Sequence, residues 1–414
     1  PGAKSFTGNL ASGVTPTLDK TSLALAAGAA TTLNLTLNGS MPVAGSYSGA
    51  VTLKGTGVSL TIPYLYLVGG GAATGYNLVY VGSGGFEGIV GQQPVDPLYT
   101  LRPHGIGVKL TDASGVPVPG SPVTWSVSPR GAVTFQNSST VTDAFGIAAT
   151  DLTVQQVGDI TVTAKIANQS YTFSGYGWNQ PTISAGGIVN DANFQSPIAP
   201  GSYVAIFGTA LSLYSDPATT STLPMVIDNV SVSFDVPSAK LSYPGRIVYV
   251  SPNQINVQVP WELQGQTSAQ VKVIIDEFVF GNVVTVALAD TTPAFFENSG
   301  VAAALDQNYG VVTTANPVKR GQLLQLYMNG LGPVSNQPAS GEPASGTTLA
   351  TTKNSPKVTI GGQDAPVQFS GLAPGFPGLY QVNVTVPAGI SAGTVPISLI
   401  IGGVTTKAST IPVQ

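Results

Sequence analysis

Apolar and polar residues alternate over short stretches along the whole chain, and this period of two predicts β-strands rather than helices. The clearest stretch occurs twice. Gln254–Pro260 reads QINVQVP, and Gln381–Pro387, which lies 127 residues further on, reads QVNVTVP. Both stretches stop at a proline, which cannot donate a hydrogen bond to a strand ladder and therefore favours a turn at that point.

The stretches around this strand are repeated as well. The offset between the two copies is 120 residues at the first matched stretch and 127 at the QINVQVP strand, so loops have gained residues while strands are kept. The further matched stretches are Gly201–Leu211 with Gly321–Leu331 (Phe207 against Tyr327), Val230–Phe234 with Val358–Gly361, and Val271–Ile275 with Val395–Ile401. Residues 178–292 and 293–414 are therefore predicted to be two similar β-modules in tandem.

The first part of the chain, residues 1–68, also has strand-like stretches at short spacing, which is typical of a β-sandwich. The motifs in order are LALA at Leu23–Ala26, TLNLTL at Thr32–Leu37, YSG at Tyr47–Gly49 and IPYLYLV at Ile62–Val68. This order resembles the fibronectin-III-like domain that follows the catalytic domain of large extracellular subtilisin-like proteases. No catalytic motif of those proteases occurs in these residues, so the resemblance implies a sandwich and no protease activity.

Residues 69–75 read GGGAATG and are predicted to be a flexible linker. The next module, residues 76–177, contains VTWSV at Val123–Val127. Trp125 alternates with the two valines, so all three are expected to face one side of a strand and to fill the sandwich core. Asp143–Gly146 has the composition of a turn between strands.

The same module carries the phrases of a known domain family. One phrase has the form V-x-D-x-x-G-x-P-V-x-x-x-x-V-x-W, and a later phrase has the form T-D-x-x-G-x-A. Both are similar to the bacterial immunoglobulin-like group 1 domain of invasin- and intimin-type adhesins, which implies a sandwich on a bacterial surface. The matching residues are Val108, Asp112, Gly115, Pro117, Val118, Val123, Trp125, Thr142, Asp143, Gly146 and Ala148.

The tandem pair, residues 178–414, resembles a C-terminal domain family of exported acidobacterial proteins, which implies no particular activity. The phrases that carry this resemblance are Ala199–Gly208, Tyr249–Leu263, Ala315–Gly321, Gly330–Val334 and Gly371–Pro387. Together, these patterns predict an all-β fold of tandem immunoglobulin-like and fibronectin-III-like β-sandwich modules, of which the last two are a repeat.

Composition restricts the classes of partner. Charged residues make up only 8% of the 414 residues, and hydrophobic residues make up 43%, which argues against disorder. The net charge of −4 offers no basic surface for nucleic acid, and no apolar run is long enough to cross a bilayer. The absence of cysteine excludes disulfides and thiolate sites, and it favours an exported bacterial protein. Because the chain begins PGAKSF, we expect that a leader was removed or that a longer precursor was cut.

Candidate catalytic and metal-ligating residues are few. His104 is the one histidine, and a turn-like sequence with no GxSxG elbow predicts a plain loop residue. The adjacent acids Asp276 and Glu277 are expected in a hairpin turn rather than facing each other across a glycosidic bond. Asp191, in VNDANF, is expected to form an Asx-turn rather than a calcium site. No catalytic, cofactor-binding or metal-binding residue is predicted.

Three further features are predicted to have structural rather than binding or catalytic roles. Gly82–Gly88 is glycine-rich and is predicted to be a loop, because no helix follows to bind phosphate. Trp178 and Trp261 could stack on sugars, but Trp261 is expected to pack at a module edge. Strand lysines that crosslink to asparagine occur in cysteine-free surface modules, but these strand lysines are predicted to point outward and stay uncrosslinked: Lys109, Lys165 and Lys272.

We therefore predict a non-catalytic extracellular structural or adhesive protein that associates with its own copies, or with another surface protein or polysaccharide. Too few charges are present to repel a second copy. Ser5–Leu10 and Ser409–Gln414 are the segments that could complete a neighbour's sheet. Two alternatives stay open: a binding or spacer region cut from a secreted subtilisin-like protease, and an enzyme that acts on polysaccharide through carboxylates.

Overall fold

A computed structural model describes residues 6–8, 14–71, 75–93, 105–277 and 279–414. Within these ranges the chain is all-β: it has no α-helix, and short 3-10 turns such as η2 (Pro237–Ala239) and η3 (Trp261–Leu263) interrupt the strands. Two compact units are present, residues 1–178 and residues 179–414, and each is described by itself. The module boundaries predicted within these units stay predictions.

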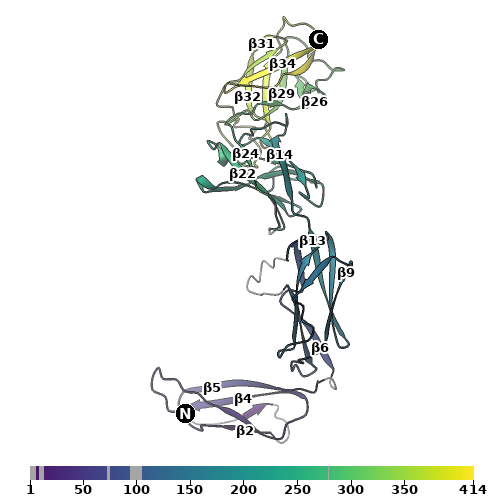
Figure 1. The fold of residues 1–414 in the computed structure, drawn as a ribbon. Coiled ribbons are helices and arrows are strands. Elements are labelled where there is room, and N and C mark those ends of the chain that lie inside the picture. Colours follow the sequence, from purple (N-terminus) through teal and green to yellow (C-terminus); the bar gives the residue numbers. More distant parts are fainter. Residues whose placement is uncertain (1–5, 9–13, 72–74, 94–104, 278) are drawn as a thin grey trace. The chain divides into compact units, whose positions relative to one another are not determined.

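The first unit begins with one three-stranded sheet and one hairpin (Figure 1). The sheet has the order β1 (Phe6–Gly8), β4 (Gly45–Gly55) and β5 (Val58–Val68), and the hairpin joins β2 (Val14–Leu18) to β3 (Leu35–Gly39). Few of the described side chains here are buried: among the apolar ones of residues 14–68, only Tyr47 and Val51 are. This part of the chain therefore has little core of its own.

Two four-stranded sheets follow in the same unit. The first has the order β10 (Val133–Gln136), β11 (Ile147–Val154), β8 (Ile106–Asp112) and β6 (Tyr76–Val81). The second has the order β7 (Gly85–Ile89), β13 (Gln169–Trp178), β12 (Gly158–Ile166) and β9 (Val123–Ser128). Alternate residues of these strands form one core cluster that includes Val108, Leu110, Val162 and Phe173, all fully buried. The alternation read from the sequence thus sets which face is inside.

The residues predicted to fill this core do so to different depths. Val123 is buried, whereas Trp125 and Val127 are half-buried and pack against the margin of the cluster. Trp125 Nε1 donates to the carbonyl of Ser139 over 3.2 Å. The predicted turn is present, because Asp143 Oδ1 accepts the backbone N–H groups of Phe145 and Ile147, both over 2.8 Å.

The prediction that Gly82–Gly88 is a loop is wrong for its second half. Gly85–Gly88 belongs to β7, which pairs in parallel with β13. A Cβ on Gly85 would lie 2.6 Å from the carbonyl oxygen of Ser174, so glycine is needed here for close approach of two backbones. Glycine-rich composition signals both loops and such close contacts, and the sequence alone does not separate them.

The second unit contains two pairs of sheets. In the first copy, one sheet has the order β14 (Thr182–Asn190), β15 (Tyr203–Thr209), β21 (Gln254–Gln258), β20 (Arg246–Val250) and β16 (Asp216–Pro217). The facing sheet has the order β17 (Val226–Ile227), β18 (Val230–Val236), β22 (Ser268–Ile275) and β23 (Val279–Phe280), with β19 (Leu241–Pro244) on β18 and β24 (Val284–Ala287) on β22.

The second copy repeats this plan. One sheet has the order β25 (Ala294–Phe295), β29 (Leu323–Asn329), β33 (Tyr380–Thr385) and β32 (Val367–Leu372), with β28 (Ala304–Asp306) on β29. The other has the order β26 (Glu297–Asn298), β27 (Val301–Ala302), β36 (Ser409–Val413), β34 (Gly393–Ile401), β30 (Lys357–Ile360) and β31 (Gln363–Ala365), with β35 (Val404–Thr405) on β34. The repeated QINVQVP and QVNVTVP stretches are the equivalent strands β21 and β33.

Candidate functional site

The residues singled out for catalysis are not assembled into a site by the described parts of the chain. His104 lies outside the described residues. Asp276 and Glu277 form the turn between β22 and β23, as predicted, with φ angles of 54° and 66°. Among the described residues, no three histidine or acidic side chains are grouped so that they could hold a metal ion.

Asp191 has a different role from the predicted Asx-turn, which is a correction. Its neighbour Asn190 makes the Asx-turn, because Asn190 Oδ1 accepts the N–H of Ala192 over 2.9 Å. Asp191 Oδ1 instead accepts Asn256 Nδ2 over 3.0 Å. Burial raises the pKa of Asp191, and the hydrogen bond from Asn256 lowers it only in part. Asn190 ends a strand beside β15, so its side chain, not that of Asp191, is the one aimed at the turn backbone.

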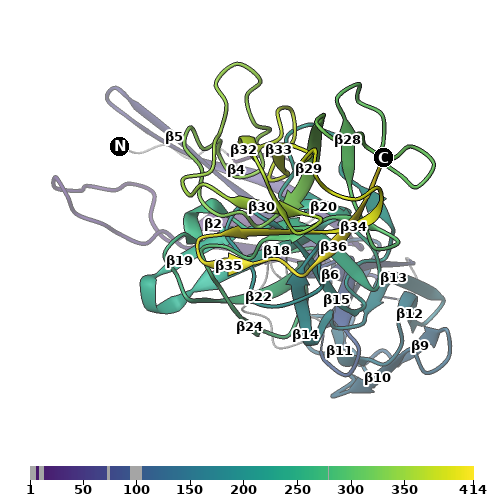
Figure 2. The ribbon, with the colours of Figure 1, turned by 90° about the horizontal axis from the view of Figure 1, so that it is seen from above.

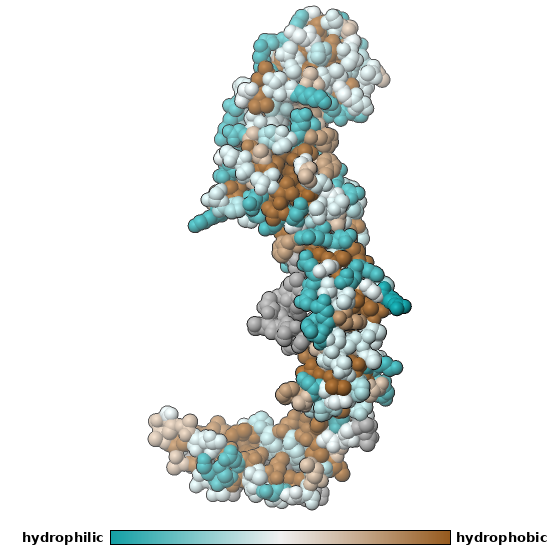
Figure 3. Space-filling model, viewed as in Figure 1, coloured by the Kyte–Doolittle hydropathy of each residue, from teal (hydrophilic) through white to brown (hydrophobic). Residues whose placement is uncertain are grey.

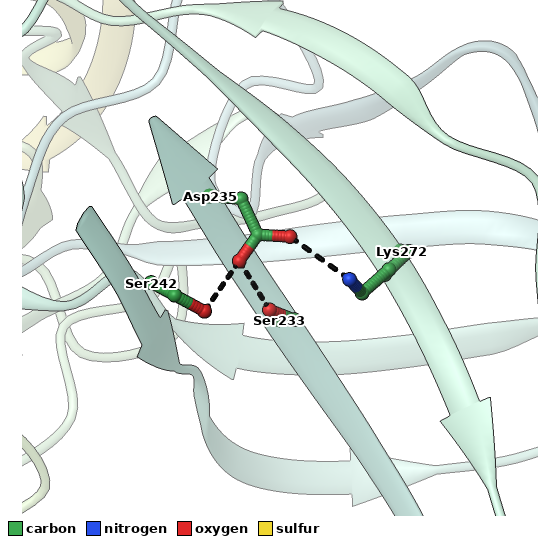
Figure 4. Close-up of polar contacts among 4 residues, drawn as sticks. All are labelled: Ser233, Asp235, Ser242 and Lys272. Atoms are coloured by element: carbon green, nitrogen blue, oxygen red, sulfur yellow. Dashed lines mark hydrogen bonds and ion pairs between the residues drawn. The ribbon is translucent and has the colours of Figure 1, made fainter. Parts of the chain in front are cut away.

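The strand lysines point outward, as predicted. Lys165 is exposed, and Lys109 and Lys272 are half-buried. Lys272 Nζ lies 3.1 Å from Asp235 Oδ2, and the other oxygen of Asp235 accepts Ser233 and Ser242 hydroxyls over 2.7 and 2.6 Å (Figure 4). Burial raises the pKa of Asp235, but these three polar partners outweigh it and hold the pKa below its usual value. The group is a surface network across β18, β19 and β22.

The C-terminal segment is already built into its own module. β36 pairs antiparallel with β34, which runs beside it, and parallel with β27 at one position (Figure 2). Donation of Ser409–Gln414 to a neighbour's sheet would have to break these pairs. Of the other proposed segment, Ser5–Leu10, the structure describes only the backbone of β1, which pairs with β4.

Neither tryptophan presents a free ring for sugar stacking. Trp178 is 9% exposed, and its Nε1 donates to Glu87 Oε2 over 3.1 Å. Trp261 is 3% exposed and belongs to the core cluster of the second copy, although it follows a strand of the first. The expected packing of Trp261 at a module edge is thus found, and its partner is the neighbouring copy.

This junction between the two copies contains a buried polar network. Asn190 and Asn329 are both fully buried, and Asn329 Nδ2 donates to Asn190 Oδ1 over 3.0 Å. Asn190 Nδ2 donates to the carbonyl of Thr292 over 2.8 Å. Asn329 also bonds the carbonyl and the N–H of Tyr203, over 2.7 and 3.0 Å. The hydroxyl of Tyr203 in turn donates to the carbonyl of Pro377.

A loop of the second copy forms the other side of the junction. The N–H of Gly341 donates to Gln258 Oε1 over 2.7 Å, and the N–H of Trp261 donates to Ser340 Oγ over 2.9 Å. Ser340 Oγ donates to Glu262 Oε2 over 2.7 Å. Because buried polar groups are costly unless paired, this degree of pairing fixes how the two copies pack.

The sequence reasoning missed the asparagines and glutamine of this junction. Asn329 and Gln258 stand at outward positions of β29 and β21, where alternation expects polar residues, so the pattern gave no signal for them. Asn190 alone follows the inward position of Ile188 in β14, and a strand that simply leaves the core gives the same pattern.

The apolar face of β4 and β5 is a second surface of interest. The register places Leu60 opposite Leu53, Ile62 opposite Val51, and Tyr66 opposite Tyr47, all on one face. Leu60 and Ile62 are 55% and 48% exposed. Brown and tan surface extends along this part of the chain on the side shown in Figure 3. Among the described residues only β4 pairs with β5, so the outer edge of β5 is also open.

The described residues form no helix with the length and apolar character that a membrane-spanning helix requires.

Solved structures similar to this chain include invasin, a bacterial integrin-binding protein, at 18% identity and a TM-score of 0.20. The match covers 82% of this chain and 60% of that one. The I67–I69 fragment of titin is similar at 9% identity and a TM-score of 0.26, over 82% of this chain and 97% of that one. At scores this low, neither structure supports an inference about this chain.

Sequence comparison is more specific. The inverse autotransporter adhesin YeeJ of Escherichia coli (strain K12) is 32% identical over 124 residues, which are 30% of this chain. The chain spans only 5% of the length of that protein. Residues 104–174 match the family model of the bacterial Ig-like domain (group 1), in agreement with the resemblance seen in the sequence phrases of this module.

Proposed function

We propose that this chain is part of a non-catalytic adhesive protein, exported to a bacterial cell surface, and that it associates with its own copies. The observation that supports the adhesive role is the group 1 Ig-like match of residues 104–174, together with the adhesin that is 32% identical over 124 residues of this chain. Both point to a protein that works by contact rather than by turnover. The localisation rests on the same two observations.

The junction of the tandem copies supports a load-bearing role. An adhesive protein is pulled between two attachment points, and a module joint that hinges freely would not transmit orientation. The buried Asn190–Asn329 pair and the insertion of Trp261 into the core of the neighbouring copy resist such hinging. Breaking the joint would leave buried polar groups without partners, which costs about 1–3 kcal/mol for each group.

The β4–β5 face supports the proposed self-association. Two sheets pack by their apolar faces at about 10 Å, and the face around Leu60 and Ile62 is left partly open by the described residues. β5 has no charged residue, so a second copy of the same face meets no electrostatic repulsion. A second copy of this sheet is therefore the occupant that we assign to the face.

Self-association is tested by light scattering and electron microscopy of the purified chain over a range of concentrations. We expect assemblies that grow with concentration, and their loss in the variants Leu60→Ser and Ile62→Ser. Leu65→Ser is the matched control, because Leu65 is 63% exposed on the opposite face of the same strand. A monomeric wild type at all concentrations, or equal loss in all three variants, would exclude this surface.

The adhesive role is tested separately by coating beads with the chain and washing them over bacterial and animal cells under flow. We expect the coated beads to be retained more than beads coated with serum albumin. No retention on any of these surfaces would rule out adhesion by this part of the protein, whatever the result for self-association.

A further inference from the structure

The two tandem copies share a second feature, on the sheet face that points away from each core. In β21 of the first copy, Gln254 and Asn256 alternate with fully buried residues and are themselves half-buried. The register places Phe207 of β15 opposite Gln254, and Tyr249 of β20 opposite Asn256. Two aromatic side chains therefore lie beside two amides on this outer face.

The second copy has the same arrangement at equivalent positions. In β33, Gln381 and Asn383 alternate with fully buried valines. Tyr327 of β29 lies opposite Gln381, and Phe369 of β32 lies opposite Asn383. In both copies a shift of the strand register directly precedes the second aromatic residue, so the bulge is kept along with the side chains.

The amides of each copy are also oriented alike. Gln254 Nε2 donates to Asn256 Oδ1 over 2.6 Å, and Gln381 Nε2 donates to Asn383 Oδ1 over 2.8 Å. In both copies the side-chain oxygen of the glutamine accepts no hydrogen bond from the described residues. In the second copy the side-chain nitrogen of Asn383 also donates none to the described residues. Each outer face therefore presents acceptors and, in the second copy, donors to solvent.

An exposed aromatic ring stands next to each of these faces. Asn190 and Asp306 are equivalent strand ends, paired with Val204 and Leu324, and each starts a turn in which its side chain accepts the N–H two residues on. The first turn carries Phe194, which is 60% exposed, and its ring centroid is 6.2 Å from that of Phe207.

The second turn carries Tyr309, which is 73% exposed. Its turn begins at Asp306, which pairs with Leu324, three residues before Tyr327 in β29. The turn of Phe194 begins in the same way at Asn190, which pairs with Val204, three residues before Phe207 in β15. Phe194 and Tyr309 both adopt left-handed backbone conformations, with φ angles of 57° and 63°. Such a conformation is uncommon for a bulky side chain.

Core packing explains why buried apolar residues are kept in both copies, but it does not explain this outer face. Exposed aromatic rings cost free energy when they face water, and strand positions on a solvent face accept most polar residues. The two copies have diverged on this face, since Ala205 of the first copy stands where Gln325 stands in the second. Both copies nevertheless keep an aromatic residue opposite the glutamine, the Gln–Asn amide pair and an exposed aromatic residue in the neighbouring turn. A shared ligand accounts for all three.

We propose that each copy carries a binding site for a neutral polysaccharide, formed by Phe194, Phe207 and Gln254 in the first copy and by Tyr309, Tyr327 and Gln381 in the second. Sugar rings have apolar C–H faces that stack on aromatic side chains, and their hydroxyls both donate to and accept from amides. The residues named for the two sites include no lysine or arginine, so a neutral ligand fits better than an anionic one. Arg246 is on the outer face of the first copy but lies opposite Gln258, against the second copy, and its Nε is buried. This inference rests on the proposed adhesive function and names its ligand class.

Two sites on one compact unit make the binding bivalent. A repetitive polymer that occupies one site is held near the second, so the apparent affinity of the pair exceeds that of either site. Loss of one site should therefore weaken binding more than twofold.

The test is affinity electrophoresis of the whole chain in native gels that contain a soluble neutral polysaccharide, with dextran, hydroxyethylcellulose, galactomannan and arabinoxylan tried in turn. We expect at least one polymer to retard the chain. Phe194→Ala and Tyr309→Ala should each weaken this binding about tenfold, and the double variant about a hundredfold or more. Phe376→Ala is the control, because Phe376 is also an exposed ring (53%) of the same unit and is not one of the residues named for either site.

Because both rings are exposed, these variants should keep the melting temperature of the wild type. Gln381→Leu provides a second variant that changes the amide and keeps the rings. If no polymer retards the chain while coated beads still adhere to cells, the polysaccharide sites are excluded and the adhesive function stands. Retardation that is unchanged in the double variant would place binding elsewhere and overturn the assignment.

Discussion

Asn329 of the second tandem copy donates a hydrogen bond of 3.0 Å to Asn190 of the first, and both side chains are fully buried. The same Asn329 amide bonds both the N–H and the carbonyl of Tyr203, which is how a neighbouring strand would bond that residue. One side chain of the second copy thus takes the place of a neighbouring strand at this residue of the first copy. Besides the connecting chain, the two copies are joined by buried polar pairing.

Replacing this amide should uncouple the copies. Asn329→Leu keeps the approximate volume but leaves the N–H of Tyr203 without the partner that Asn329 provides. It also removes one of the two donors to the carbonyl of Tyr203 and to Asn190 Oδ1, which keep the N–H groups of Asp191 and Ala192. We expect the free energy of unfolding of residues 179–414 to fall by about 2–4 kcal/mol, since a buried unpaired group costs about 1–3 kcal/mol and each lost hydrogen bond about 0.5–1.5 kcal/mol. Urea denaturation of the whole chain measures this loss. Asn354→Leu, at an exposed position of the same copy, should change stability by less than about 0.5 kcal/mol, and equal effects of the two variants would contradict the role of the junction.

Two glycines at equivalent positions of the two copies distinguish the cost of backbone strain from the cost of crowding against Trp261. Gly201 and Gly321 have φ angles of 80° and 79°, so alanine is strained by about 1–2 kcal/mol at either position. A Cβ on Gly201 would lie 2.2 Å from the ring of Trp261, whereas a Cβ on Gly321 meets no atom within 4 Å. Gly201→Ala should therefore cost about 1–3 kcal/mol more than Gly321→Ala, because Trp261 must move. Equal losses in chemical denaturation would mean that Trp261 moves without cost.

The sequence predicted the elements better than the contacts between them. Strands such as β21 and β33 follow from alternation, because one face is buried and the other is not. The junction could not be predicted from alternation. The sequence places Trp261 at the edge of a module, and only the fold shows that this edge packs against the other copy. The glycine-rich stretch before Ile89 was misread for a similar reason, since Gly85 is required by β13, which is distant in sequence.

The outer faces were missed although their signal was in the repeat. The match of Phe207 with Tyr327 and the shared Q-x-N of the two strands were both visible in the sequence. What the sequence could not supply is the register, which places each ring directly opposite a glutamine. A one-residue slip would have put these side chains on different faces.

Acid should weaken the first unit through Asp112, which is 1% exposed. Its carboxylate accepts four backbone N–H groups, those of Gly70, Gly71, Ser114 and Val116, over 2.7–3.2 Å. Burial raises the pKa of Asp112, but these bonds outweigh it and hold the pKa below its usual value. The stabilisation is therefore complete above the unfolded pKa of about 3.9 and is lost as the pH falls through the lower, folded pKa.

The variant Asp112→Ala should lose about 2 kcal/mol at pH 7, since hydrogen bonds to charged groups are worth about 1.5–3 kcal/mol. The difference in melting temperature between wild type and variant should shrink as the pH is lowered from 4 to 2. Asp159→Ala, at an exposed position of the same unit, serves as the control and should have little effect at any pH. A difference that stays constant with pH would show that Asp112 acts through shape rather than charge.

Asp191 should have the opposite dependence. Burial raises the pKa of Asp191, so the folded protein holds this proton more tightly than the unfolded chain does. The sign follows from linkage: stability falls as the pH rises from the unfolded pKa of about 3.9 through the higher, folded pKa, and the full cost is present above it. Asp191→Asn removes the charge and keeps an oxygen that accepts from Asn256.

We therefore expect Asp191→Asn to raise the melting temperature of the second unit by about 2–4 °C at pH 7 and to leave it unchanged at pH 3. Calorimetry at the two pH values measures this. Asp290→Asn is the control, because Asp290 is exposed in the same unit and should change neither value. If Asp191→Asn instead destabilised the unit at pH 7, the carboxylate would have to be held in its charged form by a partner that burial alone does not provide, and the bond from Asn256 would be stronger than its 3.0 Å length implies.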